Sequence, residues 1–147
     1  TRLPFAPVRS PIVIPGPRRK VLWLRDEPRV LIAAVLATPT GPMTVANTHL
    51  SFVPGWGRRQ LSRIRRDLSA FADPVVLMGD LNMPSPRPAA ITGYRSLARH
   101  PTFPLDRPDR QLDHILLRGH LGSVVGSSAP ALPLSDHRAL IVDLAVG

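Results

Sequence analysis

The most informative segment of this chain reads Val75-Val76-Leu77-Met78-Gly79-Asp80-Leu81-Asn82. Its first four residues are apolar without interruption, which predicts a short strand that is covered on both faces. The strand stops at a glycine, which is followed by the polar residues Asp80 and Asn82. Polar side chains at the end of a strand are held by a rigid scaffold and still reach solvent. The segment therefore predicts a buried sheet with a functional site at its edge.

The residues before this strand show a helical period. In residues 58–71 apolar side chains recur at intervals of three, four and three residues, which predicts an amphipathic helix that Pro74 ends. These side chains are Leu61, Ile64, Leu68 and Phe71. The other faces hold five arginines, Arg58, Arg59, Arg63, Arg65 and Arg66. A solvated helix face accounts for these arginines, and a phosphate-binding stripe is the alternative.

Two strands are expected before the helix. Residues 30–37 are a continuous apolar run that contains β-branched side chains, which predicts a buried strand, and residues 43–50 are expected to form the second strand. Residues 38–42 read Thr-Pro-Thr-Gly-Pro, which is turn chemistry, so we expect an antiparallel hairpin with a five-residue loop. Residues 1–18 are rich in proline and arginine and predict an irregular lead-in.

The remainder of the chain predicts three more strands. Residues 83–108 hold many prolines, which predicts a loop with one short helix near residues 89–92. The strands are expected at residues 111–117, 121–125 and 140–146. No repeat and no domain boundary is visible, so we expect one domain over residues 1–147 with an α/β fold.

Composition narrows the classes of function. The chain of 147 residues has no cysteine, which excludes a disulfide framework, a thiolate zinc site and a cysteine nucleophile. The formal charge is +9, and Lys20 is the only lysine among 19 basic residues. This charge fits a polyanionic partner such as nucleic acid or a phospholipid surface, although a coding bias toward arginine explains it equally simply. No apolar run is long enough for a transmembrane helix, and no signal peptide is visible; this favours the cytoplasm without fixing the compartment.

Four polar clusters interrupt the apolar segments. They are Asn47-Thr48-His49-Leu50, Gly79-Asp80-Leu81-Asn82, Gln111-Leu112-Asp113-His114 and Ser135-Asp136-His137. A single histidine near a strand end is most often structural. Four clusters that each contain an Asp, Asn or His make a shared functional site the better interpretation.

These residue types suit the cleavage of a phosphodiester. A hard cation such as Mg²⁺ prefers oxygen ligands, which Asp80 and Asp136 can supply. Charge that grows on the phosphoryl oxygens needs hydrogen-bond donors, and His49, Asn82 and His137 can provide them.

Activation of water needs a base that a third group orients. Asp113 and His137 are the candidates for this pair, and they lie on separate predicted segments. A two-metal phosphatase site is the weaker alternative, because it needs further histidine ligands in short fixed motifs that this sequence lacks.

The order of the four clusters resembles that of the endonuclease/exonuclease/phosphatase family, which includes DNase I-like nucleases, abasic-site endonucleases and neutral sphingomyelinases. The resemblance rests on Thr48-His49-Leu50, Gly79-Asp80-Leu81-Asn82, Leu112-Asp113-His114 and Ser135-Asp136-His137, and it extends from about residue 30 to the C-terminus. It implies a DNase I-like α/β sandwich of mixed, mainly antiparallel sheets. It also implies a hydrolase that uses Mg²⁺, or Mn²⁺ as the alternative ion.

The resemblance also implies roles for the residues at the scissile phosphate. Asp80 would be linked to the nucleophilic water, and Asn82 would donate to a phosphoryl oxygen. His49 would be a further donor on the phosphate side. Asp136 would help to bind the cation together with Asp80.

His137 would contact the phosphate or act as the base, with Asp113 orienting it. His114 follows Asp113, so strand alternation points it to the opposite face and predicts a structural role. His100 and His120 match no part of the family pattern.

The sequence departs from the family in one respect. Members normally begin with a strand that bears an Asn, followed by a Glu that is a principal metal ligand. Asp26 and Glu27 stand in a loop-like context and do not match that Glu. The resemblance therefore implies that the chain is the C-terminal half of the domain.

Two functions stay open at this point. One is a divalent-metal-dependent, nuclease-like phosphoesterase. The other is a non-catalytic truncated fragment or a basic nucleic-acid-binding module. DNA, RNA, phospholipids and small phosphoesters all remain candidate substrates, and the oligomeric state does not follow from the sequence.

Overall fold

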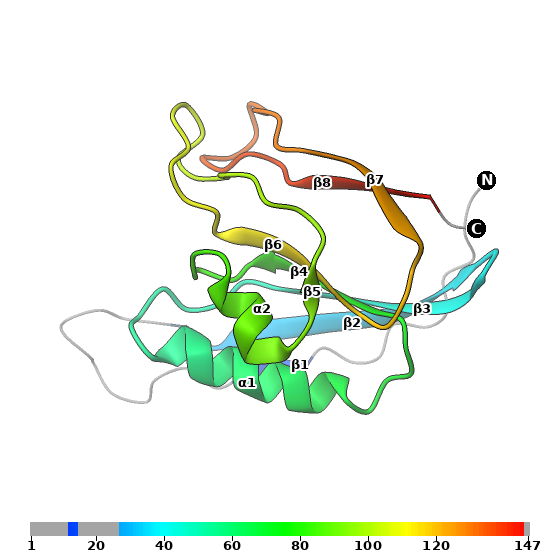
Figure 1. Cartoon of the computed structure of the whole chain (residues 1–147). Coiled ribbons are helices and arrows are strands. Elements are labelled where there is room, and N and C mark those ends of the chain that lie inside the picture. Colours follow the sequence, from blue (N-terminus) through cyan, green and yellow to red (C-terminus); the bar gives the residue numbers. More distant parts are fainter. Residues whose placement is uncertain (1–11, 15–26, 146–147) are drawn as a thin grey trace.

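The computed structural model describes residues 12–14 and 27–145 (Figure 1). The chain order of its elements is β1 (Ile12–Ile14), β2 (Arg29–Thr38), β3 (Gly41–Thr48), α1 (Trp56–Leu68), β4 (Val75–Asp80), α2 (Arg87–Thr92), β5 (Arg95–Ser96), β6 (Asp113–Arg118), β7 (Ser123–Ser128) and β8 (Ile141–Ala145).

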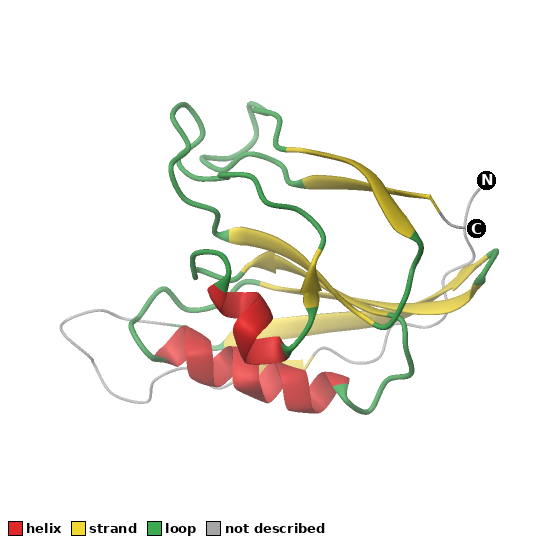
Figure 2. Ribbon diagram, in the orientation of Figure 1, coloured by secondary structure: helices red, strands yellow, loops and turns green. Residues whose placement is uncertain are grey.

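The elements form layers around one large sheet. Its strand order is β1-β2-β3-β4-β6-β5, while β7 and β8 form a separate two-stranded sheet. Only β3 and β4 pair in parallel among the described strands, and every other pair is antiparallel. Both helices lie on one side of the large sheet, and the β7–β8 pair lies on the other (Figure 2). The prediction of an α/β fold with mixed, mainly antiparallel sheets is confirmed.

The larger part of the core lies between the helices and the sheet. Leu61, Ile64 and Leu68 form the buried stripe of α1 that the sequence predicts, and each is fully buried. They belong to one apolar cluster with Val75 and Leu77 of β4. Burial of each such side chain contributes about 1.5–3 kcal/mol to folding, so this stripe fixes α1 on the sheet.

A second, smaller core lies between the two sheets. Val76 of β4 and Leu117 of β6 pack there with Val142 and Leu144 of β8. Because successive side chains of β4 point to opposite faces, the strand is apolar at every position from Val75 to Leu77. The uninterrupted run in the sequence thus reflects cover on both faces.

The predicted five-residue hairpin loop is wrong. β2 and β3 pair as far as Thr38 opposite Gly41, which leaves a two-residue turn. The Thr38 hydroxyl donates to the Gly41 carbonyl at 2.6 Å and closes the turn. Pro42 is accommodated in β3 because β4 begins to pair with β3 only at Thr44, so the missing N–H of Pro42 interrupts no ladder on that side.

Other boundaries also differ from the predictions. The helix predicted at residues 58–71 runs from Trp56 to Leu68, and the short helix near residues 89–92 begins earlier, at Arg87. Within the predicted irregular lead-in, Ile12–Ile14 form β1 against β2, and the rest of residues 1–18 lies outside the described residues.

The last three strands are shifted by one or two residues at their starts. β6 begins at Asp113, where the side chain of Thr102 accepts the backbone N–H groups of Leu112 and Asp113. β7 begins at Ser123, after Gly122 turns the chain with φ of 77°. β8 covers Ile141–Ala145, and residue 146 lies outside the described part. Among the described helices, none has the length and apolar character that crossing a membrane requires.

Candidate active site

Gly79 sets the spacing between β3 and β4. Its φ is +129°, a conformation that favours glycine, and a Cβ at this position would collide with the carbonyl oxygen of Thr48. The two backbones therefore approach more closely than side chains would allow. This contact brings His49, the residue after β3, beside Asp80, the last residue of β4.

A tight turn follows Asp80. Its Oδ1 accepts the backbone N–H of Asn82 at 2.8 Å, and Asn82 has a φ of 48° in the left-handed region. The Asn82 side chain donates from Nδ2 to the carbonyl of Leu50 at 2.9 Å and lies 3.2 Å from His49 Nε2. His49 Nε2 lies 3.4 Å from Asp80 Oδ2. The turn thus fixes an amide, a carboxylate and an imidazole side by side.

A second carboxylate and a second imidazole complete the cluster. β6 places Asp113 directly opposite Asp80 in the sheet. Asp113 Oδ2 lies 2.7 Å from His137 Nδ1, and His137 Nε2 lies 3.9 Å from Asp80 Oδ2. The His137 ring therefore stands between two carboxylates, and its Nε2 atom faces Asp80.

Two loops hold His137 in this position. The backbone N–H of Arg138 donates to the Thr102 carbonyl at 2.7 Å, and the N–H of Leu105 donates to the Asp136 carbonyl at 2.7 Å. The Phe103 ring lies 4.8 Å from the His137 ring, centroid to centroid. In Figure 1 these loops, after β5 and before β8, project beyond the sheet at the end where β6 begins.

The surroundings shift the pKa values of two members of the cluster. Burial raises the pKa of Asp80, the Asn82 N–H opposes this shift, and the neighbouring Asp113 charge adds to it. Burial lowers the pKa of His137, but the hydrogen bond and charge of Asp113, with the charge of Asp80, outweigh it and leave the pKa raised. A carboxylate that accepts a proton more readily thus faces an imidazole that retains one.

The structure brings together five of the six residues that the sequence indicates. They are His49, Asp80, Asn82, Asp113 and His137, connected by the contacts given above. The sixth, Asp136, is not joined to them by a side-chain contact. Its side chain is exposed, and Oδ1 lies 3.5 Å from the Ser135 hydroxyl. Its carboxylate contributes to the raised pKa of His137 only as the last of several causes.

Some side chains of this region carry the type of ligand atom that a hard cation prefers. Asp80 and Asp136 offer carboxylate oxygens, and Mg²⁺ in proteins is often held by one or two carboxylates together with water and substrate phosphate. Within residues 12–14 and 27–145, however, no three His, Asp or Glu side chains are grouped so that they could hold a metal ion. The sequence predicts that neither Asp26 nor Glu27 is the metal-binding Glu of the family. Glu27 lies within the described residues, and Asp26 lies outside them.

The remaining histidines lie elsewhere. His114 is buried and its Nε2 lies 2.8 Å from the Met83 carbonyl. His100 Nε2 lies 2.8 Å from the Ser127 hydroxyl. Thr102 is a residue of this site to which the sequence assigns no role. It is fully buried in a proline-rich loop, and no periodic pattern marks such a position.

The sequence was compared with protein families and with curated proteins. The sequence profile of the Endonuclease/Exonuclease/phosphatase family matches residues 4–137. No curated protein matches the sequence.

Solved structures share the fold at low sequence identity. A functionally unknown conserved protein from Enterococcus faecalis V583 has a TM-score of 0.75 and 19% identity, covering 99% of this chain and 68% of its own. An endonuclease/exonuclease/phosphatase from Bacteroides vulgatus has a TM-score of 0.68 and 21% identity, covering 82% and 56%. A mannosyl-6-phosphatase from Bacteroides thetaiotaomicron VPI-5482 has a TM-score of 0.65 and 16% identity, covering 97% and 67%. The chain thus spans about half to two thirds of the length of these relatives.

Proposed function

The chain belongs to the endonuclease/exonuclease/phosphatase family, and from this membership we propose that its site hydrolyses a phosphodiester. The observation that supports the proposal most directly is the Asp113–His137 contact of 2.7 Å beside Asp80. A carboxylate that orients an imidazole next to a second carboxylate is an arrangement suited to proton transfer. That one solved relative is a mannosyl-6-phosphatase agrees with phosphoester chemistry.

The proposed reaction is the attack of water on phosphorus. The bond from phosphorus to the water oxygen forms, the bond to the leaving oxygen breaks, and the leaving oxygen takes a proton from solvent. Asp80 accepts the proton of the attacking water, and its Oδ2 lies 3.9 Å from His137 Nε2. Protonated His137 donates through Nε2 to a phosphoryl oxygen, while Asp113 is the positioning residue that fixes its ring.

Two further side chains face the same phosphate. Asn82 Nδ2 would donate to a second phosphoryl oxygen, because the turn at Asp80 holds this amide rigidly. His49 is exposed beside it and would supply another donor. Donors fixed in advance around the developing charge stabilise the transition state without reorganisation.

The proposal includes dependence on Mg²⁺, with Mn²⁺ as the alternative ion. Asp80 and Asp136 would contribute ligands, with water and substrate completing the coordination. A bound divalent cation would neutralise charge on the phosphoryl oxygens.

Hydrolysis of a small aryl phosphodiester, with and without MgCl₂, tests the proposal. Asp80→Asn and His137→Gln should each lower the rate by about a hundredfold or more. His120→Gln is the matched control, because that histidine is exposed in a loop outside the cluster. Unchanged rates in both site variants would remove the assignment of the site.

A second candidate function is binding without turnover. It is favoured by the absence, within the described residues, of three grouped metal-binding side chains. Salt-dependent binding of nucleic acid with no hydrolysis at any MgCl₂ concentration would support this alternative. Mg²⁺-dependent cleavage by the 147-residue chain would exclude it.

A further inference from the structure

A groove of about 850 Å³ begins at Asn82 and runs past both helices. Its lining comes from the loop of residues 51–55, from Asn82 and Met83, and from α1 and α2. Asn82 lines this groove and also contacts His49 in the candidate active site. The groove is therefore continuous with that site.

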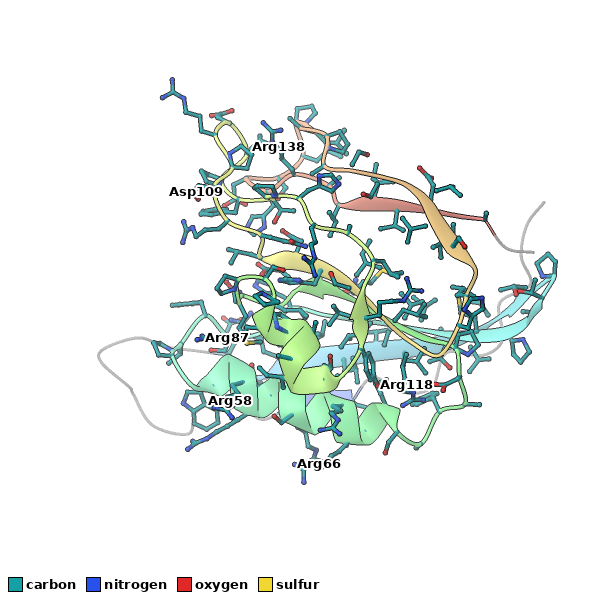
Figure 3. All side chains as sticks on the ribbon, in the orientation of Figure 1. Arg58, Arg66, Arg87, Asp109, Arg118 and Arg138 are labelled. Atoms are coloured by element: carbon teal, nitrogen blue, oxygen red, sulfur yellow. The ribbon has the colours of Figure 1, made fainter. Side chains whose placement is uncertain are left out.

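Three arginines line the groove. Arg58 and Arg65 of α1 lie seven residues apart, on the face that also presents Ser62, and the helical rise separates them by about 10 Å along the axis. Arg87, the first residue of α2, adds a third guanidinium. Figure 3 shows Arg58 and Arg87 at the same end of the two helices.

These three arginines are available to a ligand. All are exposed, and none pairs with a carboxylate of residues 12–14 or 27–145. Arg63 of the same helix differs, because its Nε donates to the Asp67 carboxylate at 3.2 Å. Unpaired guanidinium groups along a groove are suited to successive phosphates of one backbone.

The groove also has an apolar part, which presents an aromatic ring. Phe52 is 54% exposed although it is a large hydrophobic residue, and it lines the groove with Met83 and Ile91. An accessible ring beside a cationic track is the combination on which single-stranded nucleic acid stacks its bases. A duplex keeps its bases stacked inside and would leave such a ring unused.

We propose that the groove holds a single-stranded nucleic-acid segment that flanks the scissile phosphate. The backbone would follow Arg87, Arg58 and Arg65, and a base would stack on Phe52. The inference rests on the proposed function for its direction, since it takes the phosphate at Asn82 as the reacting one. It narrows the substrate class from any phosphodiester to a strand with free bases.

Binding of a labelled single strand of about eight nucleotides, measured by fluorescence anisotropy in EDTA at several KCl concentrations, tests the proposal. The triple variant Arg58→Gln/Arg65→Gln/Arg87→Gln should bind at least about tenfold more weakly at low salt. The slope of log affinity against log salt should fall in magnitude by about 2, since each neutralised single-strand phosphate contributes about 0.7. Phe52→Ala should weaken binding about tenfold for this strand and little for an abasic strand of equal length.

The control removes the same charge elsewhere. Arg66→Gln/Arg95→Gln/Arg99→Gln alters exposed arginines that do not line the groove, and Arg66 projects from the outer side of α1 in Figure 3. This variant should retain most of the affinity. If the groove triple proves unfolded by circular dichroism, Arg65→Glu alone must show the loss.

The outcomes separate this inference from the proposed hydrolysis. His137→Gln should still bind the strand although it no longer cleaves a small phosphodiester. Equal binding by the groove triple and the wild-type chain would overturn the inference and leave the hydrolase proposal standing. Tighter binding to phosphatidylserine vesicles than to the strand, lost in the groove triple, would overturn it in favour of a membrane surface.

Discussion

The side-chain oxygen of Thr102 accepts the backbone N–H of Asp113 at 3.2 Å, which ties a loop residue to the carboxylate that orients His137. The same oxygen accepts the N–H of Leu112 at 3.1 Å. Thr102 is fully buried, so neither N–H has water as an alternative partner on that side. The hydroxyl thus contacts the backbone at the start of β6, next to the Asp113 carboxylate that contacts His137.

We predict that Thr102→Val lowers hydrolysis through the position of Asp113. The substitution keeps the shape and leaves two N–H groups without their acceptor, at a cost of about 1–3 kcal/mol each. Unfolding in urea should show this loss of stability. In addition, the pH profile of hydrolysis should shift, because the contact that sustains the pKa of His137 is loosened.

Thr102→Ser supplies the control, since it keeps the hydroxyl and loses only the methyl group. It should retain the wild-type pH profile. If Thr102→Val loses stability but keeps an unshifted profile, Thr102 is a structural residue and does not position Asp113.

Some elements of this fold can be predicted from the sequence, because the apolar pattern that indicates them lies within the element itself. The stripe of Leu61, Ile64 and Leu68 predicts α1, and the run from Val75 to Leu77 predicts β4. β1 and β5 have three and two residues, too few for any period, and they form only because a neighbouring strand offers hydrogen bonds.

The candidate site likewise contains residues that the sequence indicates and one, Thr102, that it does not. Residue types at strand ends indicate Asp80, Asn82 and Asp113, and the sheet register places Asp113 opposite Asp80. The position of Thr102 depends on a loop that folds back onto β6, which no pattern of spacing encodes. The roles assigned to the cluster, including cation binding by Asp136, stay predictions until activity is measured.

We predict that Gly79→Ala disrupts the junction of β3 and β4. The added Cβ would collide with the Thr48 carbonyl oxygen, and φ of +129° is unfavourable for alanine. Together these effects should cost at least about 2 kcal/mol in the free energy of unfolding. Hydrolysis should fall further than stability alone explains, because His49 and Asp80 would be pushed apart.

Gly41→Ala separates the two effects. Gly41 has φ of +116°, but no heavy atom lies within 4 Å of the position that an added Cβ would take, so only backbone strain is added there. It should destabilise the protein less than Gly79→Ala. Equal losses of stability would mean that the close approach to Thr48 has no energetic weight.

We predict that His114 makes stability depend on pH. Burial lowers the pKa of His114 below 6.5, although the hydrogen bond to Met83 opposes the shift. The folded state therefore binds the proton less readily than the unfolded state. Its contribution to stability is complete above pH 6.5 and is lost as the pH falls from there through the folded-state pKa.

Urea unfolding between about pH 7.5 and pH 5 measures this dependence. His114→Gln can still donate toward the Met83 carbonyl but cannot titrate. The stability of this variant should change less over the acidic range than that of the wild-type chain. Identical pH dependence in the two proteins would exclude His114 as its source.

We predict that Arg118 holds the C-terminal end of α1 and cannot be replaced by lysine. Its guanidinium donates to the carbonyls of Leu68 and Phe71 and pairs with Asp73, at the end of the helix where Figure 3 places it. A lysine ammonium is a compact group without this planar fork, so Arg118→Lys should lose about 1–3 kcal/mol in the free energy of unfolding. Arg110→Lys is the matched control, because within residues 12–14 and 27–145 the only carboxylate that this arginine pairs with is the exposed Asp109, and it stacks on Phe103. Its loss should be within about 1 kcal/mol. Urea unfolding of both variants tests this prediction. Equal, small losses would show that the carbonyls of Leu68 and Phe71 are satisfied as well by solvent as by Arg118.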